Sequence, residues 1–183
     1  MSERVLIPEL KRLARVAVAD TGVPPMLLVA CAVAESGDRA NPERGCDPLA
    51  VRYEPHLDDE SRGLCQILTA TAADVGADPA RLFEPEYNLW AAAGYLRACL
   101  RYTQPGGTER DRWMVAVAAY NCGMGRVRKA MARCAPGAHW SDVLDWLDGH
   151  PAQESLNERT TKRHVAGVLR VWNWLEADDD HEA

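Results

Sequence analysis

The chain lacks the features that mark several large classes of protein. Its longest apolar run, from Met26 to Ala34, is far shorter than the ~18 residues that a membrane-spanning helix needs. Lys and Arg number 21 against 27 Asp and Glu, and the formal charge of −6 disfavours a protein that binds nucleic acid. The N-terminal segment lacks the basic start and unbroken apolar stretch of a signal peptide. We therefore expect no membrane span, no nucleic-acid partner and no signal peptide in this chain.

Metal-binding patterns are absent as well. There is no CxxC or HxxxH motif, and the five histidines are scattered, so we expect no metal site. The six cysteines allow three disulfides in principle, but most lie within apolar helical patterns, which favours buried thiols. These residues are Cys31, Cys46, Cys65, Cys99, Cys122 and Cys134.

What is present is the composition and patterning of a globular domain. Hydrophobic residues make up 47% and charged residues 26% of the 183 residues, which is enough for a packed core. Apolar residues recur with helical spacing, and prolines and glycines interrupt the pattern. Helices are predicted at 8–20, 24–36, 64–75, 88–103, 111–121, 124–134, 140–148 and 158–176.

The segment 37–62 has no helical periodicity and is long enough to suggest a functional insert. Within it, residues 49–53 alternate apolar and polar side chains, which predicts one strand of a small β-hairpin. The fold class is therefore mainly α, of the α+β type, with a small hairpin insert. We predict a single domain over 1–183, with an N-terminal helix within 1–22, a core over 24–176 and a frayed tail at 177–183.

Glu35 ends the most apolar of the predicted helices. Leu27, Cys31 and Glu35 are four residues apart, so they stack along one face of that helix. A carboxyl at the end of an apolar face loses hydration, which raises its pKa and keeps a proton available near neutral pH. Glu35 is therefore a candidate general acid. The alternative is a glutamate that simply reaches solvent at the helix end.

Two further segments carry polar side chains beside glycines. Gln66 follows Gly63 in the first turn of the third predicted helix and offers both a donor and an acceptor. Tyr120 and Asn121 end the fifth predicted helix, next to Gly123. Taken singly, a glutamine in a first helical turn is more commonly a surface residue, and a Tyr-Asn pair before glycine is more commonly a helix C-cap.

The order of these pieces along the chain is distinctive. An apolar helix ending in Glu-Ser is followed by a loop, then by Gly-Leu-Cys-Gln-Ile and later by Ala-Tyr-Asn-Cys-Gly. This order resembles the lytic transglycosylase domain of the soluble (SLT) type, which has a lysozyme-like fold. The run Leu82-Phe83-Glu84-Pro85 with Asn88 is similar to a turn of the same family. The resemblance extends from Pro24 to Val171, and the segment from Glu60 to Gln66 is most similar to phage-encoded members.

The resemblance implies roles for particular residues. Glu35 matches the catalytic acid and base of the family. The residues placed in substrate binding are Ser61, Gln66, Tyr120, Asn121 and His164. Two positions depart from the family pattern, because Cys65 stands where the family often has Met, and His164 where it often has Tyr. A histidine there would change charge near neutral pH, and the alternative is a polar residue on an amphipathic helix.

The activity implied by the resemblance is cleavage of the β-1,4 bond between N-acetylmuramic acid and N-acetylglucosamine in peptidoglycan, without a cofactor. Glu35 would protonate the leaving oxygen and then accept the proton of the muramoyl C6 hydroxyl, which closes a 1,6-anhydro ring. We expect glycan strands as the partner and a monomeric protein. We also expect action at the bacterial cell wall, in the periplasm, outside the cell or in phage lysis or the virion.

Two alternatives remain open. A hydrolase similar to goose-type lysozyme would use water and a second carboxylate, for which Asp58, Asp59 and Glu60 are candidates. A wall-binding or virion structural module would not turn over substrate at all.

Aromatic side chains offer further candidates for sugar contact. Six Trp against one Phe suit stacking on sugar rings. Trp90 and Trp113 lie within apolar helical patterns and are expected in the core. Tyr53 and His56, in the insert, are the candidates for peripheral contacts with the glycan.

Overall fold

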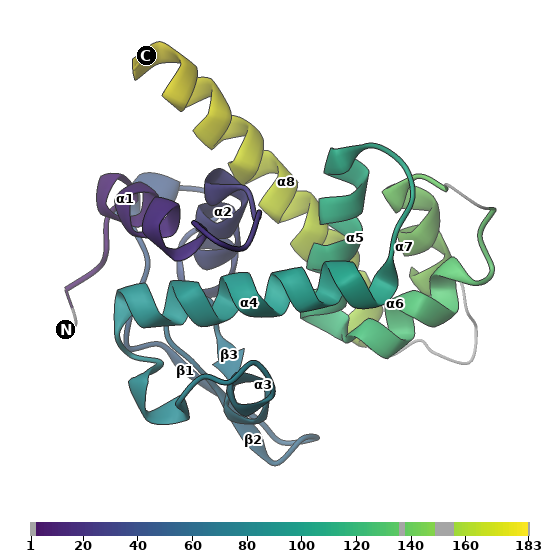
Figure 1. Ribbon diagram of the computed structural model, residues 1–183, viewed down its shortest axis with the longest axis horizontal. Coiled ribbons are helices and arrows are strands. Elements are labelled where there is room, and N and C mark those ends of the chain that lie inside the picture. Colours follow the sequence, from purple (N-terminus) through teal and green to yellow (C-terminus); the bar gives the residue numbers. More distant parts are fainter. Residues whose placement is uncertain (1–2, 136–137, 149–155, 183) are drawn as a thin grey trace. The chain divides into compact units, whose positions relative to one another are not determined.

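The computed structural model describes residues 3–135, 138–148 and 156–182. These residues form a mainly helical protein with a small antiparallel sheet (Figure 1). The helices are α1 (Ile7–Ala17), α2 (Pro25–Ser36), α3 (Thr69–Asp74), α4 (Pro85–Thr103), α5 (Glu109–Cys122), α6 (Met124–Met131), α7 (Trp140–Asp148) and α8 (Leu156–Glu182). The strands are β1 (Val51–Glu54), β2 (Asp59–Arg62) and β3 (Ile67–Leu68), and short 3-10 turns lie at Pro42–Arg44 and Pro79–Arg81. The predicted fold class is confirmed.

The chain divides into two compact units. The first unit comprises residues 1–95 and 168–183, and the second unit comprises residues 96–167. Each unit has its own packed interior. The prediction of a single domain stays a prediction.

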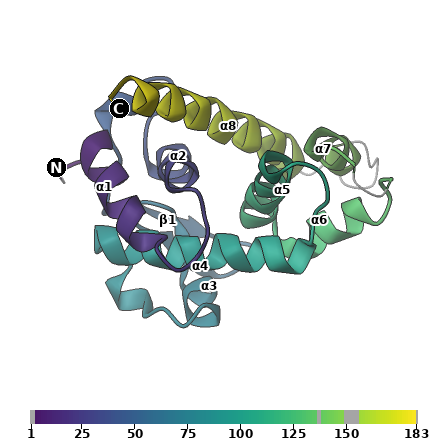
Figure 2. The same ribbon diagram turned by 45° about the horizontal axis from the view of Figure 1, so that its top comes forward.

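α2 is the buried centre of the first unit. Every residue from Met26 to Ala34 is buried. Pro24 and Pro25 begin the helix, where their fixed φ is already helical and the missing N–H of proline has no partner to lose. A helix that is apolar on all sides is stable only when other elements surround it, and α1 packs beside it (Figure 2). The apolar run from Met26 to Ala34 therefore makes α2 the central helix and places Glu35 where the helix leaves the core.

The C-terminal segment is helical, so the frayed tail predicted at 177–183 is wrong as far as Glu182, where α8 ends. The buried ammonium of Lys11 in α1 binds the carboxylates of Asp178 and Asp179, each at 2.8 Å. A charge that leaves water needs an opposite charge, so the last turns of α8 are held to α1. Residue 183 lies outside the described residues.

The small sheet has the strand order β1-β2-β3, with both pairs antiparallel. Its register places Arg52 opposite Ser61 and Glu54 opposite Asp59. Side chains alternate along a strand, so these four residues share one face of the sheet, whereas Tyr53 belongs to the other. The predicted hairpin is confirmed, and α3 lies beside the sheet (Figure 1).

The helix predicted at 64–75 is wrong over its first part. A turn precedes β3, and α3 begins only at Thr69. Gly63 and Gln66 have φ angles of +75° and +48°. A right-handed helix does not accommodate such angles, so the chain turns sharply here. Gln66 therefore lies in the turn between β2 and β3 instead of in the first turn of a helix.

The second unit contains α5, α6 and α7, which pack against one another (Figure 2). α5 begins with a capping box, in which Thr108 accepts from the Asp111 N–H and Asp111 accepts from the Thr108 N–H. The predicted core position of Trp113 is confirmed.

The predicted core position of Trp90, in α4 of the first unit, is wrong. Its side chain is 43% exposed and lies on the outward face of the helix, beside the Tyr87 ring.

The structure contains all six cysteines as thiols, as the sequence predicts. Cys31, Cys46, Cys65 and Cys99 are buried, and Cys122 and Cys134 are partly buried. Burial raises the pKa of Cys46 to about 12 and that of Cys65 well above its ordinary value. Both thiols therefore stay protonated and pack as small apolar side chains.

Candidate active site

Glu35 lies in the last turn of α2, and its side chain is only 7% exposed. The next two residues fix this helix end. The Ser36 hydroxyl donates to the Leu64 carbonyl at 2.7 Å, which ties the helix to the turn before β3. Gly37 ends the helix, and a Cβ added there would lie 2.9 Å from the Val33 backbone, so a glycine is required. The Glu-Ser-Gly sequence therefore holds the carboxyl at a defined place beside the turn.

Asn88 of α4 holds the other side of that turn. Its buried side chain accepts from the Cys65 N–H at 2.8 Å and donates to the carbonyls of Arg62 and Leu82 at 2.9 and 2.8 Å. A Cβ added to Gly63 would lie 2.3 Å from the Asn88 amide nitrogen. Gly63 and Asn88, which the resemblance singled out separately, thus pack directly against each other and together fix this turn.

Ser61 and Gln66 meet at the base of the hairpin. The Ser61 hydroxyl donates to Gln66 Oε1 at 3.0 Å. Gln66 Nε2 donates to the carbonyls of Ala50 and Gly63, both at 3.0 Å. The amide of Gln66 is thus engaged within the hairpin and stabilises the sharp turn. Contacts of Ser61 and Gln66 with substrate stay a prediction.

Two guanidinium groups and a second carboxylate surround Glu35. Arg52 Nη2 lies 3.4 Å from Glu35 Oε2, and Arg52 Nε lies 2.9 Å from Glu54 Oε1. Arg39 donates from Nη2 and Nε to the Ala34 carbonyl, at 2.7 and 3.1 Å, which brings its charge to the end of α2. The carboxyl of Glu35 therefore lies between a buried apolar helix and a small group of charges.

Burial dominates the protonation of Glu35. It raises the pKa of this carboxyl from 4.5 to about 7, although the charges of Arg52 and Arg39 lower it. The Glu54 carboxylate adds a further, smaller increase. A carboxyl with this pKa is partly protonated at neutral pH and can both donate and accept a proton, which a general acid and base requires. The elevated pKa predicted from the stacking of Leu27, Cys31 and Glu35 is thus present.

The three acidic residues suggested for a hydrolytic site have other partners. Asp58 accepts from the Tyr53 hydroxyl at 2.6 Å, Asp59 accepts from the Thr69 hydroxyl and the Ala70 N–H, and Glu60 pairs with Arg62 at 2.5 Å. Through these contacts the three carboxylates stabilise the hairpin and the start of α3. The carboxylate that shares a guanidinium with Glu35 is instead Glu54.

The remaining predicted residues lie in the second unit. Tyr120 is half-buried and Asn121 exposed at the end of α5, which Gly123 terminates with a φ of +95°. Asn121 Oδ1 accepts from the buried hydroxyl of Thr161 in α8 at 2.9 Å. His164, one turn further along α8, is buried. Thr161 is therefore a member of this group that the sequence did not reveal.

Comparison with known proteins decides the family. Residues 12–141 match the family described as "Transglycosylase SLT domain". The chain belongs to this family. A protein named "Membrane-bound lytic murein transglycosylase F", from Hahella chejuensis (strain KCTC 2396), is 30% identical over 114 residues. The alignment covers 61% of this chain and 21% of that relative, so the chain spans about a fifth of the relative's length.

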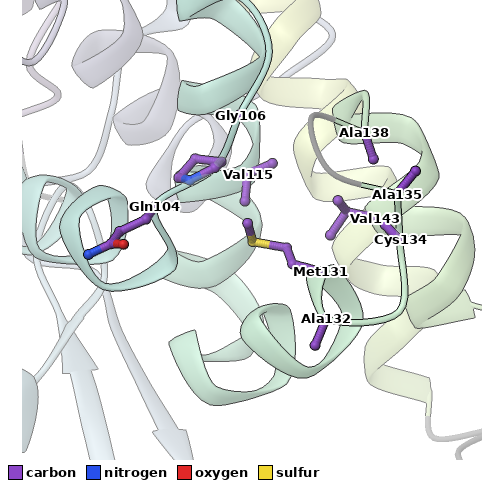
Figure 3. A pocket seen from close by; sticks show the side chains of 10 residues that line it. Gln104, Gly106, Val115, Met131, Ala132, Cys134, Ala135, Ala138 and Val143 are labelled. Carbon is purple, nitrogen blue, oxygen red and sulfur yellow. The ribbon is translucent and has the colours of Figure 1, made fainter.

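A cavity of about 360 Å³ lies within the second unit (Figure 3). Its lining is mostly apolar and includes Val115 of α5, Met131 of α6 and Val143 of α7. Its lining, within the described residues, includes none of the residues to which the resemblance gives a catalytic or substrate-binding role, and it has no Asp, Glu or His side chain that could act as a general acid or base.

Among residues 3–135, 138–148 and 156–182, no helix combines the length and apolar character that crossing a membrane requires. Within the same residues, no three His, Cys, Asp or Glu side chains gather as metal ligands.

Sequence reasoning missed Arg52 and Glu54. Both lie in the insert that the sequence marked as functional, but the strand predicted at 49–53 stops before Glu54, which the structure adds to β1. What this strand meets depends on how the hairpin packs against α2, which no local pattern encodes. The available signal was a pair of opposite charges two positions apart, with Arg52 inside the predicted strand and Glu54 just beyond it.

Proposed function

We propose that this SLT domain is a peptidoglycan lytic transglycosylase in which Glu35 is the single general acid and base. The observation that carries the proposal is the carboxyl of Glu35 itself. It is 7% exposed at the end of a buried helix, and burial raises its pKa to about 7. The family and the name of the Hahella relative support the reaction class and peptidoglycan as the substrate.

The protonated carboxyl of Glu35 donates its proton to the oxygen that leaves as the bond between N-acetylmuramic acid and N-acetylglucosamine breaks. The ionised carboxylate then accepts the proton of the muramoyl C6 hydroxyl, whose oxygen attacks C1 and closes the 1,6-anhydro ring. Because the attacking hydroxyl belongs to the same sugar, its high effective concentration favours it over water. The carboxyl ends the cycle protonated, as it began.

The positive charge that develops at C1 needs a stabilising group. In glycosidases with two carboxylates, the second carboxylate supplies it. We assign this part to the N-acetyl group of the substrate, because Asp58, Asp59 and Glu60 are engaged with Tyr53, α3 and Arg62. Tyr120, Asn121 and His164 are proposed as substrate-binding residues of the second unit.

The test compares muropeptide release from purified peptidoglycan by the unaltered protein and by Glu35→Gln. The amide keeps the shape of the protonated carboxyl but donates no acidic proton, so we expect release to fall by at least the roughly 100-fold that general acid catalysis contributes. Glu86→Gln, an exposed carboxyl of α4, is the matched control and should keep full activity. Sedimentation with peptidoglycan should show that Glu35→Gln still binds.

Undiminished release by Glu35→Gln would remove Glu35 from the mechanism. Binding without release by the unaltered protein would instead favour the structural wall-binding module.

A further inference from the structure

Arg52 joins two carboxylates with one guanidinium group. Its Nη2 atom lies 3.4 Å from Glu35 Oε2, and its Nε atom lies 2.9 Å from Glu54 Oε1. The two contacts use different nitrogens, so the guanidinium serves both carboxylates at once. The carboxylates differ in their surroundings, because the side chain of Glu35 is 7% exposed and that of Glu54 is 26% exposed.

The hairpin places this arginine, although its side chain is largely in solvent. Arg52 and Glu54 are two residues apart in β1, so they share one face of the sheet, and from this face Arg52 reaches Glu35 at the end of α2. On the backbone side, the Ser61 hydroxyl oxygen lies 3.3 Å from the Arg52 carbonyl oxygen and 3.0 Å from Gln66 Oε1, and its single proton is shared between these two acceptors. The strand register and the turn before β3 therefore fix the base of the arginine side chain.

Other charged and titratable groups also surround Glu35. Arg39, in the segment after α2, and the Cys65 thiol, in the turn before β3, both interact with it electrostatically. Arg170 of α8 donates to the Arg39 carbonyl at 3.0 Å and interacts with the Arg39 charge. His56 Nδ1 lies 4.0 Å from Glu54 Oε2. Among these groups, Arg52 is the one whose guanidinium contacts both carboxylates.

We propose that Arg52 is a positioning residue whose guanidinium is shared between Glu35 and Glu54, and that this sharing determines the pH range in which Glu35 acts as an acid. The role rests on the proposed function, because it concerns the same carboxyl. Arg52 stabilises the ionised form of Glu35. Glu54 draws the guanidinium towards the strand and limits that stabilisation.

The arrangement predicts shifts of opposite sign from neighbouring substitutions. Arg52→Gln removes the cation, so the ionised form of Glu35 is less stable and the titration midpoint of Glu35 rises, by roughly one pH unit. Glu54→Gln removes the competing anion and leaves the guanidinium to Glu35, so the midpoint falls. If the pair served only to hold the hairpin, both substitutions would loosen the same contact and would not produce opposite shifts.

The first measurement is the titration of the Glu35 carboxyl carbon by NMR in protein labelled at glutamate side chains, with the signal assigned by its loss in Glu35→Gln. This readout does not require activity. We expect the midpoint order Arg52→Gln, unaltered protein, Glu54→Gln, from high to low pH. Arg52→Lys keeps the charge without the planar fork and should lie between the unaltered protein and Arg52→Gln.

The second measurement is the pH profile of muropeptide release by the same variants. Release should decline as the pH rises through the Glu35 midpoint, because the proton donor is lost, and the declines should follow the NMR order. The matched controls are Arg12→Gln and Glu9→Gln, an exposed Arg–Glu pair on α1, which should leave both readouts unchanged.

The two readouts separate this proposal from the proposed function. Shifted NMR midpoints without muropeptide release by any form, the unaltered protein included, would support the role of Arg52 and contradict the proposed function. Normal release with coincident midpoints, or with both midpoints displaced in the same direction, would overturn the role of Arg52 alone.

Discussion

Replacing Glu35 with glutamine should make the protein more stable at alkaline pH while abolishing its activity. The folded protein holds the carboxyl at a pKa of about 7, against 4.5 for the exposed group. Between these two values the folded state binds a proton that the unfolded state has released, so the unfolding free energy falls as the pH rises. The contribution of the Glu35 carboxyl to the unfolding free energy is largest below pH 4.5 and decreases as the pH rises to about 7. Above that pH it does not change further.

The size of the effect follows from the same pKa. Each unit of difference between the folded and unfolded pKa values corresponds to about 1.36 kcal/mol. Ionisation of Glu35 therefore lowers the unfolding free energy by about 3 kcal/mol. The side chain is 7% exposed, so solvent screening reduces this value little. Glutamine resembles the protonated carboxyl and never ionises, so Glu35→Gln avoids this cost above pH 7.

The assay is urea unfolding of both proteins at a series of pH values from 4 to 9, with Glu86→Gln as the exposed control. We expect the difference in unfolding free energy between Glu35→Gln and the unaltered protein to grow by about 3 kcal/mol in favour of the variant. The growth should occur between pH 4.5 and about 7. A difference that stays constant with pH would show that Glu35 titrates as an ordinary exposed carboxyl, and the argument from burial would fail.

Two further predictions concern the elements that position the site. Gly63→Ala should cost more than about 2 kcal/mol of unfolding free energy in chemical denaturation, because its Cβ would lie 2.2 Å from a backbone oxygen, whereas Gly76→Ala, at the same φ of +75° but in open space, should cost much less. Equal losses of unfolding free energy in the two variants would show that the positive φ, and not the close contact of Gly63, causes the destabilisation. Replacing both Asp178 and Asp179 with Asn should lower the unfolding free energy by about 3 kcal/mol, since buried Lys11 loses its charge partners. An unchanged denaturation midpoint would show that α8 does not depend on this pair.

The central helix and its terminal glutamate were predictable because their signals are local. The continuous apolar run from Met26 to Ala34 is stable only inside a core, and fourfold spacing then places Glu35 on the same side as Leu27. The hairpin was predictable from the alternation of residues 49–53. In each case the periodicity of the side chains sufficed, since neighbours along the chain decide the outcome.

The turn around Gln66 was not predictable in this way. The apolar residues Leu64, Cys65 and Ile67 continue a helical pattern, and nothing local indicates that a glutamine adopts a φ of +48°. The conformation is imposed by Asn88, twenty-two positions away, and by the hydroxyl of Ser61. Tertiary hydrogen bonds here outweigh the local preference for helix.

The charged partners of the site depend on long-range packing too. Arg52 lies seventeen positions from Glu35, and Lys11 lies 167 and 168 positions from its two carboxylates. Pairings at such distances along the chain follow from how elements pack, so the sequence marked neither the shared guanidinium nor the helical C-terminus. The outward position of Trp90 has the same origin, because its neighbours Leu89 and Ala91 occupy the buried face of α4.

The most direct test of the proposed function is mass spectrometry of the soluble products that the protein releases from purified peptidoglycan. Ring closure by the muramoyl C6 hydroxyl predicts muropeptides that end in 1,6-anhydro-muramic acid, lighter by one water than the reducing form, and their absence with Glu35→Gln. Products with reducing ends would contradict the account. They would show that water attacks C1 and would make Glu54, with Asp58, Asp59 and Glu60, the carboxylates to replace next.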